Sequence, residues 1–167
     1  MADAQDKTML SHFLAALAYR TQKALRGAPE DFSDFAAGNL VRTPAQLVRH
    51  MTSVLGYART FFRGGHCRPE PLNTFSDEVT RFHAMLGDLI GHLERDDPLI
   101  DMTEERLLQG PFSDAMTHVG QLAMLRRLHG SPVPPEDFIF ADIDPSNVSE
   151  NQAPPQRPDQ RWLEKLV

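Results

Sequence analysis

Apolar residues recur at every third or fourth position in four stretches of the chain, a spacing typical of amphipathic helices. The stretches run from Lys7 to about Arg26, from Pro44 to about Phe62, from Ser76 to Arg95 and from Phe112 to Gly130. Each predicted helix has one apolar stripe, which it can bury only by packing against other helices. The pattern therefore predicts an all-α fold in the form of a four-helix bundle.

Two of the predicted helices have clear end signals. Thr43 precedes Pro44, so a hydroxyl N-cap is followed by a proline at the first helical position, where its missing N–H costs nothing. In the fourth helix, Ser113 or Asp114 is the predicted cap at the start, and Gly130 is the predicted left-handed residue at the end.

The composition changes after Gly130. Seven of the 13 prolines lie there, and because proline interrupts helices, this segment is not expected to form a fifth long helix. We expect a single domain over residues 1–167, with the bundle at about 7–130 and a Pro-rich, mostly irregular C-terminal tail at 131–167. Apolar side chains are predicted to pack the tail against the helices through Phe138, Ile139, Phe140 and Ile143, and to dock its end through Trp162, Leu163 and Leu166.

The chain is acidic, with 23 Asp and Glu against 17 Lys and Arg and a formal net charge of -6. Nucleic acids and anionic membranes attract basic surfaces, so neither is an expected partner. The polar start lacks a hydrophobic leader and no apolar run is long enough to span a membrane, so we expect a cytoplasmic protein. Cys67 is the single cysteine, which excludes an internal disulfide and a cysteine-rich zinc site.

Three residues with metal-binding side chains are predicted to face inward. Asp114 and His118 are four positions apart in the fourth helix and share one face. This spacing suits a metal ion, although such pairs also form plain surface hydrogen bonds. His50 falls on the inward side of the second helix, either as a core histidine bonded to a neighbouring group or as a third ligand facing that pair.

The remaining helical histidines divide by position. His83 lies at the edge of the apolar stripe of the third helix and is a candidate pocket residue. His12 and His92 fall on the polar faces of their helices, so we expect both imidazoles to face solvent.

Two segments, TPAQLVRHMTSVLGYARTFF and THVGQLAMLRRLHGSPV, resemble the DinB-like (DinB/YfiT) superfamily of four-helix-bundle metalloenzymes, and the resemblance extends from the first helix to Gly130. In that family a histidine of the second helix and an H-x-x-x-H pair of the fourth, followed by G-Q-L, hold a divalent metal. His50 matches the first ligand, His118 the last, and Gly120-Gln121-Leu122 the trailing motif. Asp114 stands where the family has the first histidine of the pair, so the implied ligands are His50, Asp114 and His118.

The resemblance implies a divalent metal ion, with zinc or nickel suited to this set and iron(II) or manganese as alternatives. Some members of the superfamily are thiol-dependent transferases and isomerases, which implies a low-molecular-weight thiol and a small electrophilic substrate. Tyr57, His83 and Gln121 are the candidate pocket or second-layer groups. The alternatives are a non-catalytic metal- or ligand-binding stress-response module, and a structural homodimer in which the three polar residues are joined only by hydrogen bonds.

Overall fold

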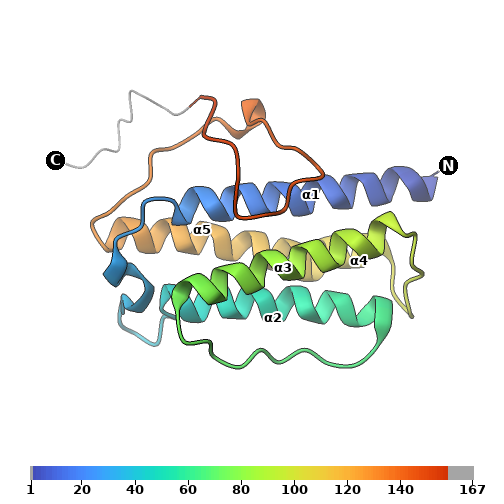
Figure 1. Cartoon of the computed structure of the whole chain (residues 1–167), viewed down its shortest axis with the longest axis horizontal. Coiled ribbons are helices and arrows are strands. Elements are labelled where there is room, and N and C mark those ends of the chain that lie inside the picture. Colours follow the sequence, from blue (N-terminus) through green and yellow to red (C-terminus); the bar gives the residue numbers. More distant parts are fainter. Residues whose placement is uncertain (1, 158–167) are drawn as a thin grey trace.

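The computed structural model describes residues 2–157, and over these residues the chain is helical with no β-strand (Figure 1). Its four long helices are α1 (Ala2–Leu25), α2 (Pro44–Arg63), α3 (Phe75–Glu94) and α5 (Ser113–Leu128). Shorter elements are η1 (Glu30–Asp34), α4 (Glu104–Leu107), the π turn η2 (Leu108–Phe112) and η3 (Phe138–Phe140). The all-α prediction is confirmed, and the four helices expected from the apolar spacing are present within a few residues of the expected bounds.

The four long helices lie side by side (Figure 1). α2 packs against α3 and α5, and α1 packs against α5 and α3, so each long helix has two long neighbours. Their apolar stripes meet in one core, in which the side chains of Leu14, Leu17, Met51, Leu55, Phe82, Leu86, Leu89 and Leu122 are fully buried. Burying each of these side chains contributes about 1.5–3 kcal/mol, so this core fixes the positions of the helix faces that carry the site.

The start of α2 follows the prediction. The Oγ1 atom of Thr43 accepts a hydrogen bond from the N–H of Gln46 at 3.3 Å, and the N–H of Thr43 donates to Oε1 of Gln46 at 3.0 Å. Pro44 takes the first helical position. This reciprocal capping box fixes the origin of α2, and with it the direction in which His50 projects almost two turns later.

The start of α5 differs from the prediction. Neither Ser113 nor Asp114 caps a free helix end, because α4, the π turn and α5 are one continuous helical segment. Pro111 lies within the π turn, and the hydroxyl of Ser113 donates to the carbonyl of Leu108 at 2.6 Å. The prediction of a side-chain cap was wrong because helical backbone, rather than a loop, precedes Ser113. Asp114 is consequently not used as a cap.

The described part of the tail, residues 131–157, contains one short helix and runs across α1 and α3 (Figure 1). Phe138 packs on α1, where the guanidinium of Arg20 lies 3.8 Å from its ring centre, and Val148 is buried. Ile139 and Phe140 are exposed, so the expectation that they pack was wrong. The expected docking of Trp162, Leu163 and Leu166 lies outside the described residues.

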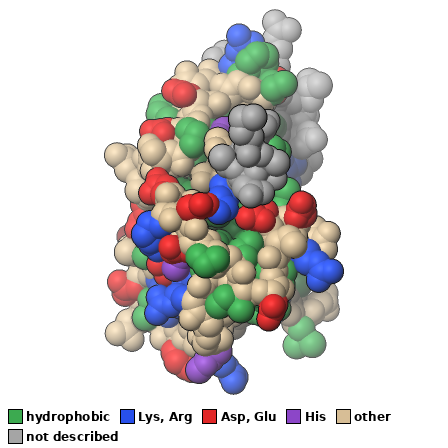
Figure 2. All heavy atoms as spheres, turned by 90° about the vertical axis from the view of Figure 1, so that its right-hand side faces the viewer, with side chains coloured by type: hydrophobic (Ala, Val, Ile, Leu, Met, Phe, Trp, Pro, Cys, Tyr) green, Lys and Arg blue, Asp and Glu red, His purple; other side chains and the backbone are tan. Residues whose placement is uncertain are grey.

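Charged side chains of both signs are mixed at the end of the molecule where α3 finishes. On this face, basic residues are interspersed with acidic ones and do not form a continuous basic patch (Figure 2). Lys7 pairs with Asp96, and Arg95 pairs with Asp97 at 2.9 Å. Among the described helices, none has the length and apolar character required to cross a membrane.

Candidate metal centre

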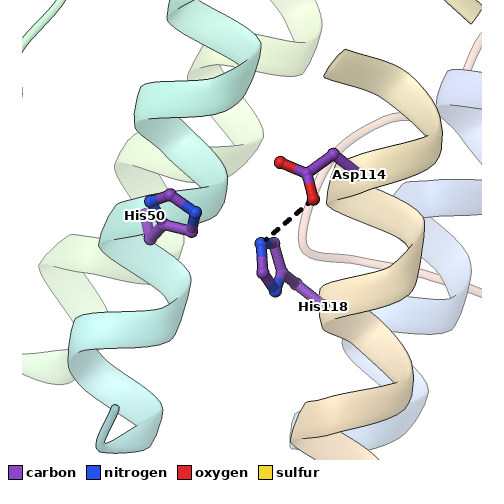
Figure 3. Close-up of side chains that lie close together, drawn as sticks. All are labelled: His50, Asp114 and His118. Atoms are coloured by element: carbon purple, nitrogen blue, oxygen red, sulfur yellow. Dashed lines mark ion pairs between the residues drawn. The ribbon is translucent and has the colours of Figure 1, made fainter. Parts of the chain in front are cut away.

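His50, Asp114 and His118 lie together in the space between α2 and α5. One ligand atom from each side chain lies within 4.8 Å of the ligand atoms of the other two. The two imidazole rings are 4.8 Å apart between centroids and are inclined by 72°. Figure 3 shows the three side chains pointing toward one another, one from α2 and two from α5. This cluster, called the triad below, can hold a metal ion.

The His118 ring is oriented by a neighbour on its own helix. Its Nδ1 atom lies 2.8 Å from Oε1 of Gln121. Because an amide oxygen only accepts hydrogen bonds, Nδ1 carries the proton and the lone pair is on Nε2. That Nε2 atom is buried, has no hydrogen-bond partner within the described structure, and lies 3.5 Å from Oδ1 of Asp114. An unpaired buried acceptor costs about 1–3 kcal/mol, and a metal ion would satisfy it.

His50 is half-buried, and its environment favours the neutral ring. Burial lowers the pKa of His50, the positive charge of Arg42 lowers it further, as does repulsion from His118 when that ring is protonated, and Asp114 acts in the opposite direction. Only a neutral imidazole has a lone pair for a metal ion. The environment of His50 therefore keeps it in the form that a ligand requires.

Asp114 opens the triad to solvent, because its side chain is 51% exposed whereas that of His118 is 9% exposed. The carboxylate is part of the wall of a groove of about 720 Å³ between α2 and the π turn. Residues of α2, the π turn and α5 form the rest of this wall: Ser53, Val54, Tyr57, Gln109, Gly110, Pro111, Ser113 and Thr117. A molecule in the groove would thus approach the triad from the carboxylate side.

The donor set fits a metal ion with an open coordination position. Two imidazole nitrogens and one carboxylate oxygen are ordinary ligands of zinc and related ions, and three protein ligands leave room for a water or substrate atom. Asp114 is the exposed member of the triad and also lines the groove, so a small molecule in the groove would lie beside this carboxylate.

The other expected site residues are placed differently. Gln121 contacts His118, and Tyr57 lies in the groove wall as a 58% exposed residue. His83 lies on α3 and contacts the tail: its Nδ1 is 2.7 Å from the carbonyl oxygen of Val148, and its Nε2 is 2.8 Å from Nε2 of Gln22. The first contact holds the tail on α3, and the second joins α3 to α1.

The groove wall contains residues that the sequence analysis did not single out. Ser53 follows His50 by three positions and Thr117 follows Asp114 by three, so each shares a helix face with a ligand. That spacing could have identified Ser53 and Thr117 as residues near the metal ligands. No sequence signal indicated that Gln109 and Gly110 would join the wall, because their place depends on the π turn.

His12 and His92 were both predicted to lie on polar helix faces and to be exposed to solvent. His12 is exposed, as expected. His92 is buried, so the expectation that it faces solvent was wrong. Its ring stacks on Phe62 with 5.0 Å between centroids, and its Nδ1 lies 2.6 Å from Oδ2 of Asp97. A side chain of α2 and the loop after α3 together cover this part of the polar face.

Comparisons of the chain with protein-family models, curated proteins and solved structures found no match. A metal centre is therefore supported by the geometry of the triad and by the sequence motifs around it.

Proposed function

We propose that the chain binds a divalent metal ion through His50, Asp114 and His118 and uses it to activate a thiol or a water molecule in the adjoining groove. In this proposal the four long helices form a four-helix bundle of the DinB-like kind. The observation that carries the proposal is the buried, unpaired Nε2 of His118, which lies beside a carboxylate and a second imidazole. Hydrogen bonding within the described residues leaves this atom unsatisfied, whereas a shared metal ion accounts for all three side chains.

The reaction class follows from the donor set and the groove. A bound divalent ion acts as a Lewis acid and lowers the pKa of a coordinated thiol or water, which supplies a nucleophile near neutral pH. The groove would hold a small electrophilic substrate against the carboxylate side of the triad. The hydroxyl groups of Ser53, Tyr57 and Thr117 in its wall can orient polar atoms of that substrate by hydrogen bonds.

The proposed ion is zinc or nickel, for which two imidazoles and a carboxylate are suitable ligands. The same set also suits iron(II) and manganese. Elemental analysis of protein purified without a histidine tag identifies the ion, because a tag would bring metal of its own.

Three alanine variants test the site. His50→Ala and His118→Ala are expected to lose most of the bound metal, because each removes one of three ligands. His12→Ala is the matched control, since His12 is an exposed histidine of α1 and is expected to leave the metal content unchanged. Equal metal content in all three variants and in the unmodified chain would overturn the proposed site.

A cobalt-substituted form tests the chemistry. A thiol that takes the open position is expected to add sulfur-to-metal charge-transfer bands to the cobalt spectrum. Normal cobalt binding without these bands for any common cellular thiol would exclude the thiol reaction. It would favour either water activation or the non-catalytic binding module, and a hydrolase screen would separate the two.

A further inference from the structure

A second cavity, of about 540 Å³, lies on the face of α5 opposite the triad. α1 and α5 form its walls and the tail segment 133–138 covers it. Cavities of this size hold small organic molecules in other proteins. It lies on the other side of α5, so a ligand bound in it would not touch the proposed metal centre.

The lining of this cavity is largely apolar. The apolar residues are Ala24 from α1, Met116, Val119, Ala123 and Met124 from α5, and Val133, Pro134, Pro135 and Phe138 from the tail. Gly120 also lines it, and a Cβ atom added there would meet no other atom within 4 Å. The space over Gly120 is therefore open, and a longer side chain at this position would enter the cavity.

Three cationic side chains and one carboxylate complete the described lining: Arg20, Lys23, Arg127 and Glu136. The guanidinium of Arg20 stacks on Phe138, and one of its N–H groups points at the sulfur of Met116 at 3.8 Å, a weak acceptor. Lys23 donates to the carbonyl of Pro134. Both cations are half-buried, and neither of these hydrogen bonds is to a carboxylate.

Glu136 offsets only part of this positive charge. Its Oε1 atom accepts a hydrogen bond from the hydroxyl of Tyr19 at 2.6 Å. Burial lowers the pKa of Arg20 and of Lys23, although the attraction of Glu136 acts in the opposite direction. The cavity is thus cationic within a chain whose formal net charge is -6.

We propose that this cavity binds a small organic monoanion with an apolar body, of which a medium-chain carboxylate is the simplest example. The apolar body would lie along Val119, Gly120 and Ala123. The carboxylate would lie between Arg20 and Lys23, where it gains charge-assisted hydrogen bonds in a partly desolvated place. Glu136 would repel a second negative charge, so the site selects monoanions over dianions.

Calorimetric titration with three probes of equal chain length tests the charge preference. Octanoate is expected to bind at least about tenfold more tightly than octan-1-ol and octylammonium, because only octanoate is complementary to Arg20 and Lys23. The double variant Arg20→Gln with Lys23→Gln is expected to lose that advantage. Equal or tighter binding of octylammonium, or no binding of octanoate to the unmodified chain, would overturn the proposal.

Two glycine variants test the location. Gly120→Leu is expected to abolish octanoate binding by filling the cavity. Gly87→Leu is the matched control, because Gly87 is a glycine of α3 at which an added Cβ also meets nothing within 4 Å. Circular dichroism verifies the fold of each variant, and Ala123→Leu fills the same space if Gly120→Leu does not fold. Octanoate binding to a folded Gly120→Leu or Ala123→Leu with unchanged affinity would place the ligand elsewhere and overturn the proposal.

Discussion

Gln121 fixes the proton of His118. The amide oxygen accepts from Nδ1 at 2.8 Å, and the opposite nitrogen, Nε2, is directed at Asp114 without a hydrogen bond of its own. The two residues are three positions apart on α5, so the helix itself brings the acceptor to the ring. A ring held in this way needs no rearrangement to bind a metal ion through Nε2.

Removing that acceptor should weaken metal binding. Gln121→Leu leaves Nδ1 without its partner and frees the tautomer and the ring, and loss of such a supporting hydrogen bond lowers affinity about 10- to 100-fold. Gln121→Glu should retain or increase affinity, because a carboxylate accepts the same hydrogen bond. Zinc titration against a competing chelator measures the effect, with Gln156→Leu in the exposed tail as control. Equal zinc affinity in Gln121→Leu and in the control would show that the hydrogen bond does not support the site.

Substitutions of Asp114 distinguish a direct metal ligand from a residue that only orients His118. As a direct ligand, Asp114→Ala should remove most of the metal affinity, whereas Asp114→His should keep the ion and shift preference toward zinc or nickel over manganese. As a residue that only orients His118, Asp114→Ala should cost about 10- to 100-fold. Zinc and manganese titrations of both variants distinguish these outcomes, and unchanged affinities in Asp114→Ala would remove Asp114 from the centre.

His83 should make the stability of the fold depend on pH. Its Nδ1 donates to Val148 and its Nε2 accepts from Gln22, so the native state holds a neutral ring. Burial lowers the pKa of His83 below its ordinary value of 6.5, while hydrogen bonding to Val148 and the charge of Glu150 oppose the shift. Because the folded-state pKa is the lower one, this contribution is fully present above pH 6.5 and is lost as the pH falls through the folded-state pKa.

Urea unfolding between pH 7 and pH 5 measures this loss. The unmodified chain should lose more stability on acidification than His83→Gln, in which the titrating ring is absent. Subtracting the two curves removes the contribution of other groups, His50 included. If the free energy of unfolding depended on pH in the same way in both proteins, the folded state would not favour the neutral ring of His83.

Two glycines in helices should respond to alanine in opposite directions. At Gly56 of α2 an added Cβ would overlap the sulfur of Cys67, which packs against this position. Gly56→Ala should therefore destabilise the fold by about 1–3 kcal/mol, the usual cost of overpacking. Gly87→Ala meets no atom and should stabilise by up to about 1 kcal/mol, through helix propensity. Chemical denaturation measures both, and a neutral Gly56→Ala would mean that the loop at Cys67 moves aside without cost.

The helices could be predicted because their stabilising interactions are local or periodic. Leu47, Met51 and Leu55 repeat on one face of α2, and the Thr43 capping box involves residues three positions apart. Burial of His92 could not be predicted in this way. Phe62 comes from another helix and Asp97 from the following loop, so only the packed structure brings them to the ring.

The triad was partly predictable for the same reason. Helical spacing places Asp114 and His118 on one face, and the apolar arc of α2 turns His50 inward. The distance between the two helices, and hence the closeness of the three ligand atoms, is decided by the side chains that fill the core between them. The groove beside the triad was not predicted, since it is bounded by a π turn, the turn that contains Pro111, which the apolar spacing did not indicate.

The π turn lets the apolar faces of α4 and α5 both point into the core. Leu107 and Phe112 are five positions apart, yet both are fully buried. In an uninterrupted α-helix, residues with this separation project about 140° apart, so one of them would point away from the core. The wider turn acts as a phase correction: it rotates α5 about the helix axis relative to α4, so that the buried sides of both are aligned. Deleting one residue from it should force a choice between burying Leu107 and keeping Asp114 and His118 in front of His50.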